Sequence, residues 1–588
     1  MCGILGTNSG GTLVDDPRVI ASIAHRGPDS TASFIDGKMG MRISRLAIIN
    51  SFVDDQPAHG CSNSITAVMN GEIYNYKKLA DDLRARGHAL PAEYSDAAVI
   101  PHLFEEYGHE FVSKLDGMFA IAIWNSSSEE LSIYRDSLGI KPIYYHISEN
   151  NLVFASEINS LITLMGKAPG ISNKSLIEFC EDNLICSPST IYEGIYSLIP
   201  GTFLKINSKG SSTYRWYKSW PSRENTTKNI KQLTDEFEDL LIESISDQIS
   251  HGACNALLLS GGLDSALIAY IIRKKLNNKV DTFHLGYESE IESKKEETIL
   301  AKKIARDLDF NFTLVNLNSK TYFEKLDYAL DAFAQPFGGV TSTYFISETI
   351  AKEHKVCLTG DGADELFGSY RKIQNAASMY YTKGLSQTKK VMAPEKDLLE
   401  FLAIPSENHL TFSESSSKAF QLDTEIKYFK QNLNIFDFSL LESQLRLLPD
   451  QVLMFSDHLG MTHGLEIRPP YLSQKIIDFS RRLPLETLID QNGTTKLLLK
   501  NLGARYFGQE FVLRKKEGFM LPLREWLPTP HAQEWITKKI FDFDISGNKM
   551  LNLNRIEKYI LEFYQGKHDN FFRVYRVALL MHYLKNHE

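Results

Sequence analysis

The chain has 588 residues, 43% of them hydrophobic and 23% charged, which is typical of a folded protein with roughly two to four domains. Its formal net charge of −9 argues against nucleic acid as a main partner, because a phosphate backbone is bound by a basic surface. No apolar run approaches the roughly 18 residues of a membrane helix. The N-terminus also lacks the pattern of a signal peptide, so we expect a cytoplasmic protein without a membrane partner.

Cys2 is the first chemical feature of the chain, in the opening segment MCGILG. Removal of Met1 would give this residue both a nucleophilic thiol and a free α-amine. The other five cysteines (61, 180, 186, 254 and 357) form no Cys-x-x-Cys pair and show no spacing typical of zinc ligands. We therefore expect no disulfide framework, and we interpret these five as small buried hydrophobic residues.

Residues 1 to about 200 have the pattern of short strands separated by turns. Apolar or aromatic runs bounded by Gly, Asn or Ser clusters lie at 41–50, 64–76, 117–136 and 151–157. Apolar residues three or four apart indicate helices at 76–87 and 96–108. This mixture predicts stacked antiparallel sheets with helices on the outside.

The pattern changes after a polar, Pro-containing segment at 217–232, which is the best candidate for a linker. Beyond it, strand-like and helix-like segments alternate. Strands are expected at 253–259, 280–285, 312–317 and 356–360, and helices at 266–276, 296–308, 321–333 and 346–354. Such alternation predicts βαβ units and a parallel sheet. From about residue 370 onward helical patterns dominate.

The segment SGGLDS begins at Ser260, after the first of these strands and before a helix. Backbone N–H groups at a helix N-terminus bind anions, so Ser260, Gly261, Gly262 and Ser265 are suited to hold a phosphate group. Asp264 would repel phosphate unless a divalent cation lay between them, which indicates Mg²⁺. A tight turn without a ligand remains the alternative for a Gly-Gly pair taken alone.

A second strand end leads into the acidic segment GDGADELFGSY, which holds Asp361, Asp364 and Glu365. In an open parallel sheet, ligands bind at the carboxyl ends of the strands, where this loop and the SGGLDS loop should meet. Four carboxylates, with Asp264 included, are too many for one buried site without a cation. The alternative is a solvated acidic turn with Asp364 as a helix N-cap.

Together these segments resemble the asparagine synthetase family of glutamine-dependent amidotransferases. SGGLDS is similar to the PP-loop of ATP pyrophosphatases, and GDGADELFGSY to the second acidic loop of the family. LGMTHGLEIRPPYL, GTTKLLLK and RKKEGFMLPLREWL resemble its C-terminal signatures. The N-terminal half independently resembles a class II, N-terminal-nucleophile glutaminase through MCGILG, HRGPD, SRLAIIN, MNGEIYNY, SDAAVI, LDGMFAIAIW and DSLGIKPIYY.

The resemblance implies an αββα glutaminase domain at 1–215, with Cys2 N-terminal after Met1 removal. It implies a synthetase domain at 230–588, built on a parallel PP-loop sheet with a helical C-terminal part, so that the fold class is mixed, α/β and α+β. The implied reaction hydrolyses glutamine to ammonia, activates a carboxylate with ATP and Mg²⁺, and releases an amide, AMP and pyrophosphate. An enclosed path between the domains is expected, because free ammonia would be protonated and lost in water.

The resemblance also assigns roles to residues of the glutaminase half. Cys2 is the nucleophile and its own α-amine is the base. Asn70 and Gly71 match the oxyanion hole, Arg45 the group that binds the α-carboxylate of glutamine, and Glu72 and Asp96 the groups that bind its α-amine. Taken alone, Arg45 and Asp96 could be surface charges, and Asn70-Gly71 could be a hairpin turn.

In the synthetase half, Asp264 and Asp364 match the Mg²⁺ ligands and Asp361 the base for the attacking ammonia. Lys496 matches the group that stabilises the activated intermediate, although a lysine on an apolar helix could instead only extend its amine to solvent. The implied ATP-binding residues are Leu259, Ser260, Gly261, Gly262, Asp264, Ser265, Leu285, Thr359 and Gly360.

Several positions depart from the pattern of the family. Asp361 stands where Glu is usual, Ser473 where a carboxylate is expected, and Ile43 where a His usually precedes the arginine by two residues. The segments 250–255 and 514–519 also differ. Most of these departures lie in the synthetase half, away from the phosphate-binding residues. This pattern favours a chain that retains the reaction with ATP, and it leaves the identity of the acceptor open.

Aspartate is the leading acceptor, and the alternative is another carboxylate, such as a uronic acid sugar or a natural-product acid. A nitrogen sensor that binds ATP and glutamine without turnover is a further hypothesis, which the set of Cys2, Asn70, Asp264 and Lys496 disfavours. A β-lactam-forming enzyme is another, and it would not need Cys2. The expected partners are therefore glutamine, ATP and a carboxylate. A homodimer is one arrangement that the sequence leaves open.

Overall fold

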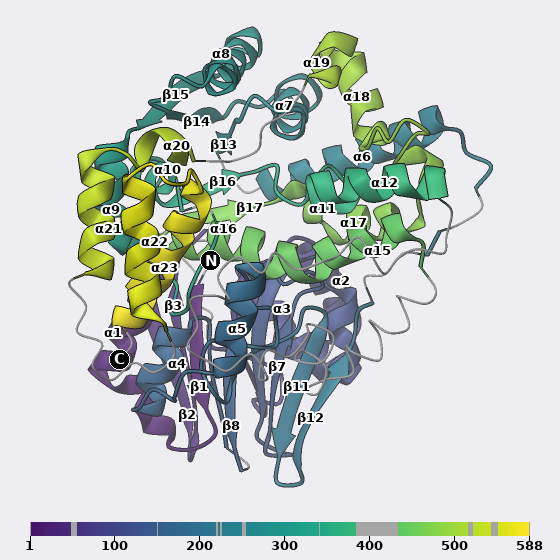
Figure 1. The fold of residues 1–588 in the computed structure, drawn as a ribbon. Helices are drawn as coiled ribbons and strands as arrows, with labels where there is room; N and C mark the ends of the chain where they lie inside the picture. The colour runs from purple at the N-terminus through teal and green to yellow at the C-terminus, as the bar shows by residue number, and fades with distance from the viewer. Residues whose placement is uncertain are drawn as a thin grey trace.

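The computed structural model describes most of the chain. The described residues are 2–48, 56–149, 151–218, 222–223, 226–249, 255–339, 341–383, 433–514, 521–541 and 551–586. Figure 1 shows two halves, the purple and blue strands of the N-terminal half and the teal, green and yellow elements of the C-terminal half. The N-terminal end of the chain lies where the two halves meet.

Two antiparallel sheets of six strands form the N-terminal half. The first has the order β10 (Ile195–Ser197), β8 (Tyr144–Ser148), β9 (Asn151–Ala155), β1 (Cys2–Thr7), β3 (Met39–Arg45) and β2 (Ser30–Asp36). The second has the order β12 (Gly210–Arg215), β11 (Thr202–Asn207), β7 (Glu130–Arg135), β6 (Gly117–Asn125), β5 (Ile65–Ile73) and β4 (Ala58–His59). The predicted runs at 41–50, 64–76, 117–136 and 151–157 overlap β3, β5, β6, β7 and β9.

Helices cover the outer faces of these two sheets. Apolar side chains of both sheets, among them Ile4, Met41 and Val68, are buried together between them. The helices α1 (Pro17–Ile23), α4 (Ile158–Met165) and α5 (Asn173–Asp182) pack beyond the first sheet, and α2 (Tyr76–Ala85) and α3 (Val99–Tyr107) beyond the second. The predicted αββα arrangement is confirmed.

A five-stranded parallel sheet forms the centre of the C-terminal half. Its order is β15 (Asn311–Leu317), β14 (Asp281–Tyr287), β13 (Ala256–Leu258), β16 (Val356–Leu358) and β17 (Glu466–Arg468). The α-helices between β13 and β16 in the chain are α7 (Leu263–Tyr270), α8 (Glu292–Asp307), α9 (Ser319–Asp331) and α10 (Thr343–Ile350). The predicted βαβ units and parallel sheet are therefore confirmed.

Helices make up most of the remaining described chain, as predicted. They are α6 (Ile230–Ile249), α11 (Ala363–Phe367), α12 (Arg371–Lys383), α15 (Ile435–Glu442), α16 (Leu453–Met461), α17 (Gln474–Arg482), α18 (Leu497–Phe507), α19 (Gln509–Leu513), α20 (Leu523–Trp526), α21 (Pro530–Ile540), α22 (Leu553–Tyr564) and α23 (Phe571–Asn586). Among the residues that the structure describes, no helix is both long and apolar enough to cross a membrane.

Candidate active sites

Cys2 begins β1 at the boundary between the two halves. Its Cα pairs with that of Arg45 on the neighbouring strand β3, and both side chains are buried. Burial raises the pKa of the Cys2 thiol, and the positive charge of Arg45 opposes that shift. A thiol kept protonated in this way needs a nearby base to become a nucleophile. Because Arg45 is buried, the alternative interpretation of this residue as a surface charge is wrong.

Asn70 lies beside Cys2 on β5. Its Oδ1 accepts a hydrogen bond of 3.2 Å from the Cys2 backbone nitrogen. Its Nδ2 is fully buried and has no hydrogen-bond partner among the described residues. A buried amide donor without a partner is costly unless a ligand uses it, so this atom is suited to bind an oxyanion.

Gly71 follows on the same strand, where no side chain would fit. A Cβ atom there would lie 2.0 Å from the carbonyl oxygen of Met118 on β6, and the φ of Gly71 is 151°. The strand continues through Ile73, so the hairpin interpretation of Asn70-Gly71 is wrong.

Two buried carboxylates complete this pocket. Asp96 accepts a hydrogen bond of 2.8 Å from the Ile73 nitrogen. Glu72 Oε1 lies 3.2 Å from the guanidinium of Arg468, at the end of β17 in the other half. Its Oε2 is buried without a hydrogen-bond partner among the described residues. Burial and the nearby Asp96 raise the pKa of Glu72 to about 8.

The SGGLDS loop connects β13 to α7 and is held by its own two serines. The Ser260 nitrogen donates to Ser265 Oγ at 3.1 Å, and the Gly262 nitrogen donates to Ser260 Oγ at 3.2 Å. Gly261 lies at the turn with a φ of 76°. The predicted strand, turn and helix are therefore present, with N–H groups near a helix N-terminus where a phosphate can bind.

The second predicted loop meets the first. Gly360 lies directly against Asp264, because a Cβ atom at Gly360 would come within 3.1 Å of the Asp264 Cβ. Lys496 Nζ is 2.8 Å from Asp264 Oδ1 and also pairs with Asp364 Oδ1. The amine is buried at the start of α18, so it does not extend to solvent. The N-cap of α11 is Gly362 and not Asp364.

The remaining ATP-binding predictions lie around these loops. Leu259 directly follows β13, and Leu285 lies within β14; both are buried. The Thr359 nitrogen donates to the Arg468 carbonyl at 3.0 Å. The predicted residues at the ends of β13 and β16 are therefore brought together, and Arg468 of β17 joins them to Glu72 in the other half.

The donor set of Asp264 and Asp364 fits a divalent cation. Two carboxylates that share one ammonium group supply the hard oxygen ligands and the negative charge that Mg²⁺ prefers. Glu365 next to them is buried, and burial together with Asp364 raises its pKa to about 7. We therefore retain Asp264 and Asp364 as the residues that would hold Mg²⁺.

Two family models match the chain in succession. A glutamine amidotransferase domain matches residues 1–217, and asparagine synthase matches residues 236–585, which is more than half of the chain. The chain belongs to the asparagine synthase family. It is an ATP-dependent, glutamine-hydrolysing ligase.

Several curated proteins are similar to the chain, two of them over more than four fifths of their length. Asparagine synthetase [glutamine-hydrolyzing] 1 of Bacillus subtilis is 29% identical, covering 91% of this chain and 89% of its own. A putative asparagine synthetase of Mycobacterium bovis is 27% identical, covering 87% and 84%. The amidase chry2 of Gibberella zeae is 28% identical, covering 59% and 54%.

Solved structures that resemble parts of the chain share little sequence with it. The allosteric regulatory enzyme of purine biosynthesis is 15% identical, covers 53% of this chain and 80% of its own, and has a TM-score of 0.29. An NH3-dependent NAD synthetase from Campylobacter jejuni is 16% identical, covers 37% and 94%, and has a TM-score of 0.19.

Arg26 is a buried site residue to which the sequence analysis gave no role. Its Nε donates to the Cys2 carbonyl at 3.3 Å. Its two terminal nitrogens pair with Glu157 at 2.9 Å and with Asp457 of α16 at 2.7 Å. Lys141 lies 3.5 Å from the same Asp457. Arg26 belongs to the motif HRGPD and Lys141 to the motif DSLGIKPIYY. The sequence therefore marked both residues as part of family motifs, although it did not indicate their contacts.

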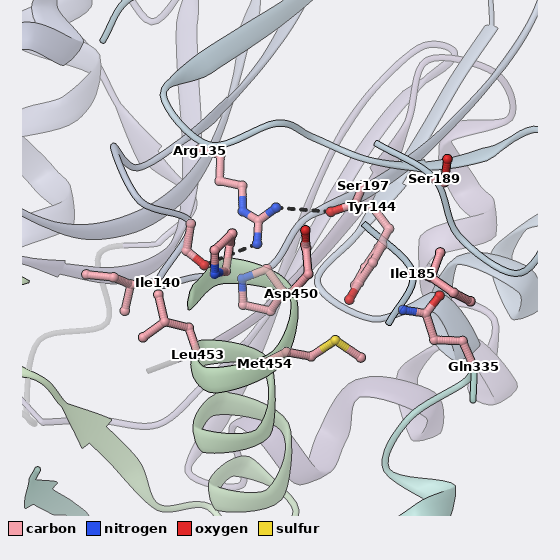
Figure 2. A pocket seen from close by; sticks show the side chains of 13 residues that line it. Arg135, Ile140, Tyr144, Ile185, Ser189, Ser197, Gln335, Asp450, Leu453 and Met454 are labelled. Carbon is pink, nitrogen blue, oxygen red and sulfur yellow. Dashed lines mark hydrogen bonds between the residues drawn. The ribbon is translucent and has the colours of Figure 1, made fainter. Parts of the chain in front are cut away.

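A cavity between the halves lies apart from both predicted sites. It is small and is lined by residues of both halves, among them Arg135, Tyr144, Gln335, Asp450 and Met454 (Figure 2). Arg135 donates to Ser197 Oγ at 3.0 Å, as the dashed line shows (Figure 2). Because none of the predicted catalytic residues lines this cavity, it is not a candidate active site.

The positions that depart from the family pattern are only partly described. Asp361 Oδ2 accepts a hydrogen bond of 2.8 Å from Ser456 of α16. Ser473 is buried just before α17 and makes no side-chain cap bond. Ile43 is buried in β3 between the two sheets. The segments 250–254 and 515–519 lie outside the described residues.

Proposed function

We propose that the chain has the two domains expected from its sequence, a glutaminase domain at 1–215 and a synthetase domain at 230–588. The change from antiparallel to parallel sheets supports this division. We also propose the predicted cytoplasmic location. The observation that best supports the function is the meeting of the SGGLDS loop and the acidic loop at Lys496, in a chain whose other half buries Cys2 against Asn70.

In the glutaminase half-reaction, the α-amine of Cys2 takes the thiol proton once Met1 is removed. The thiolate attacks the amide carbon of glutamine, and the oxyanion that forms accepts hydrogen bonds from Asn70 Nδ2 and the Gly71 nitrogen. The α-ammonium returns the proton to the amide nitrogen, ammonia leaves as the C–N bond breaks, and water then hydrolyses the thioester to glutamate and free Cys2. The buried guanidinium of Arg45 binds the α-carboxylate of glutamine, and Asp96 and Glu72 Oε2 bind its ammonium group.

In the synthetase half-reaction, a carboxylate oxygen of the acceptor attacks the α-phosphorus of ATP, and pyrophosphate leaves. Ser260, Ser265 and the loop N–H groups bind the phosphates, and Lys496 stabilises the negative charge of the activated acid. Mg²⁺ held by Asp264 and Asp364 would neutralise phosphate charge. Ammonia then attacks the acyl carbon and AMP leaves, while Asp361 accepts the surplus proton.

Helix α16 provides the connection between these two reactions. Its residue Ser456 hydrogen-bonds Asp361, and the next residue, Asp457, pairs with Arg26, which contacts Cys2. Arg468 makes a second link, from Glu72 to Thr359. We propose that ammonia passes between these two links, enclosed by buried side chains.

Aspartate is the proposed acceptor, with asparagine as the product. The curated relatives named as asparagine synthetases, which match most of the chain, support it. Another carboxylate acceptor remains the second candidate, because Asp361 is one methylene shorter than the usual glutamate and Ser473 replaces an expected carboxylate.

ATP/pyrophosphate exchange with a panel of acids tests the acceptor directly. Aspartate should stimulate exchange above the level without acid, and uronic acid sugars should not. Exchange stimulated by another acid but not by aspartate would reject asparagine synthesis while leaving the reaction class intact.

A further inference from the structure

Four side chains with metal-binding atoms meet on the outer surface of the N-terminal half. Cys61 lies in the turn between β4 and β5, and His88 in the segment after α2. His102 and Glu105 lie one turn apart on α3, so they point to the same side of that helix. One ligand atom of each residue lies within 4.8 Å of the others.

The distances within this group suit a tetrahedral site. Cys61 Sγ is 3.4 Å from His102 Nδ1 and 3.7 Å from His88 Nδ1. Glu105 Oε2 is 3.7 Å from each of these two nitrogens. With zinc–ligand bonds of about 2.0–2.3 Å, tetrahedral geometry places neighbouring ligand atoms about 3.3–3.6 Å apart. A metal ion therefore fits with movements of only a few tenths of an ångström.

Neighbouring groups orient the possible ligands as they do in known metal sites. The second ring nitrogen of His88 lies 3.3 Å from Glu106 Oε2, which leaves Nδ1 to face the cluster. Glu105 is held by the backbone nitrogens of Cys61 and Ser62, each at 2.9 Å. Gly60 allows this approach, because a Cβ atom there would lie 2.4 Å from the Glu105 carboxylate.

Zinc takes its ligands as a neutral imidazole, an ionised carboxylate and a thiolate. Zinc binding would release the proton of the Cys61 thiol and form a thiolate ligand.

We propose that Cys61, His88, His102 and Glu105 form a structural zinc site. Thiolate, imidazole and carboxylate ligands together are typical of zinc, and four protein ligands leave no open position for catalysis. The metal ion would connect the β4–β5 turn and the segment after α2 to α3. Because β5 carries Asn70 and α3 follows Asp96, the zinc would stabilise two walls of the glutamine pocket.

The metal content of untagged, full-length protein tests the proposal. After equilibration with zinc and removal of loosely bound metal, the wild type should retain about one zinc per chain, measured by plasma mass spectrometry. Cys61→Ser and His102→Gln should lose it. His59→Gln, two residues from Cys61 in the same hairpin, should keep it.

Two measurements on the wild type avoid any dependence on folding of the variants. Cobalt(II) should give a thiolate-to-metal charge-transfer band and the visible bands of tetrahedral cobalt. Zinc should also protect Cys61 from alkylation, mapped by peptide mass spectrometry, and a chelator should remove that protection. No retained zinc in the wild type, or equal zinc in Cys61→Ser, would overturn the proposal, as would cobalt binding without a thiolate band.

Discussion

At the scale of single residues, the proposed glutamine pocket contains buried polar atoms that other side chains do not hydrogen-bond. Asn70 Nδ2 and Glu72 Oε2 are both buried without a hydrogen-bond partner among the described residues. Such atoms cost stability in a folded protein, typically about 1–3 kcal/mol each. Their presence beside Cys2 is explained if glutamine and its oxyanion supply the missing partners.

Asn70→Ala should lower the turnover number for glutamine hydrolysis about 10²–10³-fold, because one oxyanion donor is lost. Amide formation from added ammonium should be unchanged. Asn75→Ala is a matched control, because Asn75 lies in the same segment but bonds the Lys114 carbonyl. Glutamate release within threefold of the wild type would contradict the assigned role of Asn70.

Glutamine binding should depend on the ionisation of Glu72. Its pKa of about 8 lies above the usual value, so the carboxyl is mostly neutral at lower pH and becomes charged as the pH rises. In a Cys2→Ala background, where no chemistry occurs, glutamine should bind several-fold more tightly at about pH 8.5 than at about pH 6.5. Calorimetry gives the dissociation constant at each pH.

The added substitution Glu72→Gln should weaken binding and remove that pH dependence. If the dissociation constant of the double variant changed with pH as much as that of Cys2→Ala, a group other than Glu72 would be titrating.

Asp361→Asn separates the two steps of amide formation. Because Asp361 is assigned to the proton released by ammonia, pyrophosphate exchange should continue while amide formation falls at least about 10²-fold. Loss of both activities in a folded variant would place Asp361 in ATP or acceptor binding instead.

At the scale of elements, α16 contacts residues of both proposed sites, as Arg468 at the end of β17 also does. The adjacent residues Ser456 and Asp457 of α16 contact Asp361 and Arg26, respectively.

The strands, the SGGLDS turn and the parallel sheet could be predicted from the sequence, since each depends on local periodicity and turn residues. The pairs Arg26–Asp457 and Glu72–Arg468 could not, because they join residues about 400 positions apart.

The cysteines show the same limit of local patterns. Cys180 and Cys357 are buried as predicted, but Cys61 is exposed and lies among histidines, so its interpretation as a buried hydrophobic residue is wrong. Its neighbours come from α3 and the segment after α2, and their spacing matches no zinc motif. Cys186 is only half-buried, and Cys254 lies outside the described residues.

Asp457→Asn should uncouple the two reactions. The substitution keeps the shape of the side chain but removes a charge that pairs with the fully buried Arg26, at a cost of up to about 3–5 kcal/mol. We expect a lower melting temperature and several-fold more glutamate formed per amide. Lys372→Gln breaks a surface pair with Glu442 and should change neither quantity. An unchanged ratio of glutamate to amide would argue against a role of α16 in transfer.

At the scale of the whole molecule, the proposed glutamine site and the proposed ATP site lie in two halves that buried ion pairs connect. The two halves differ in sheet type, yet Arg26 and Arg468 place buried charges across their boundary. Buried ion pairs are weak sources of stability. Their position between the two sites instead supports a role in aligning one reaction with the other.

The activity of Cys2→Ala with two nitrogen sources tests this account most directly. With glutamine, ATP and aspartate the variant should form no amide, because the nucleophile is absent. With ammonium, ATP and aspartate it should form amide at close to the wild-type rate, since the synthetase site is intact. Loss of the ammonium-driven reaction in a variant with the wild-type melting temperature would contradict the assignment of two separate sites.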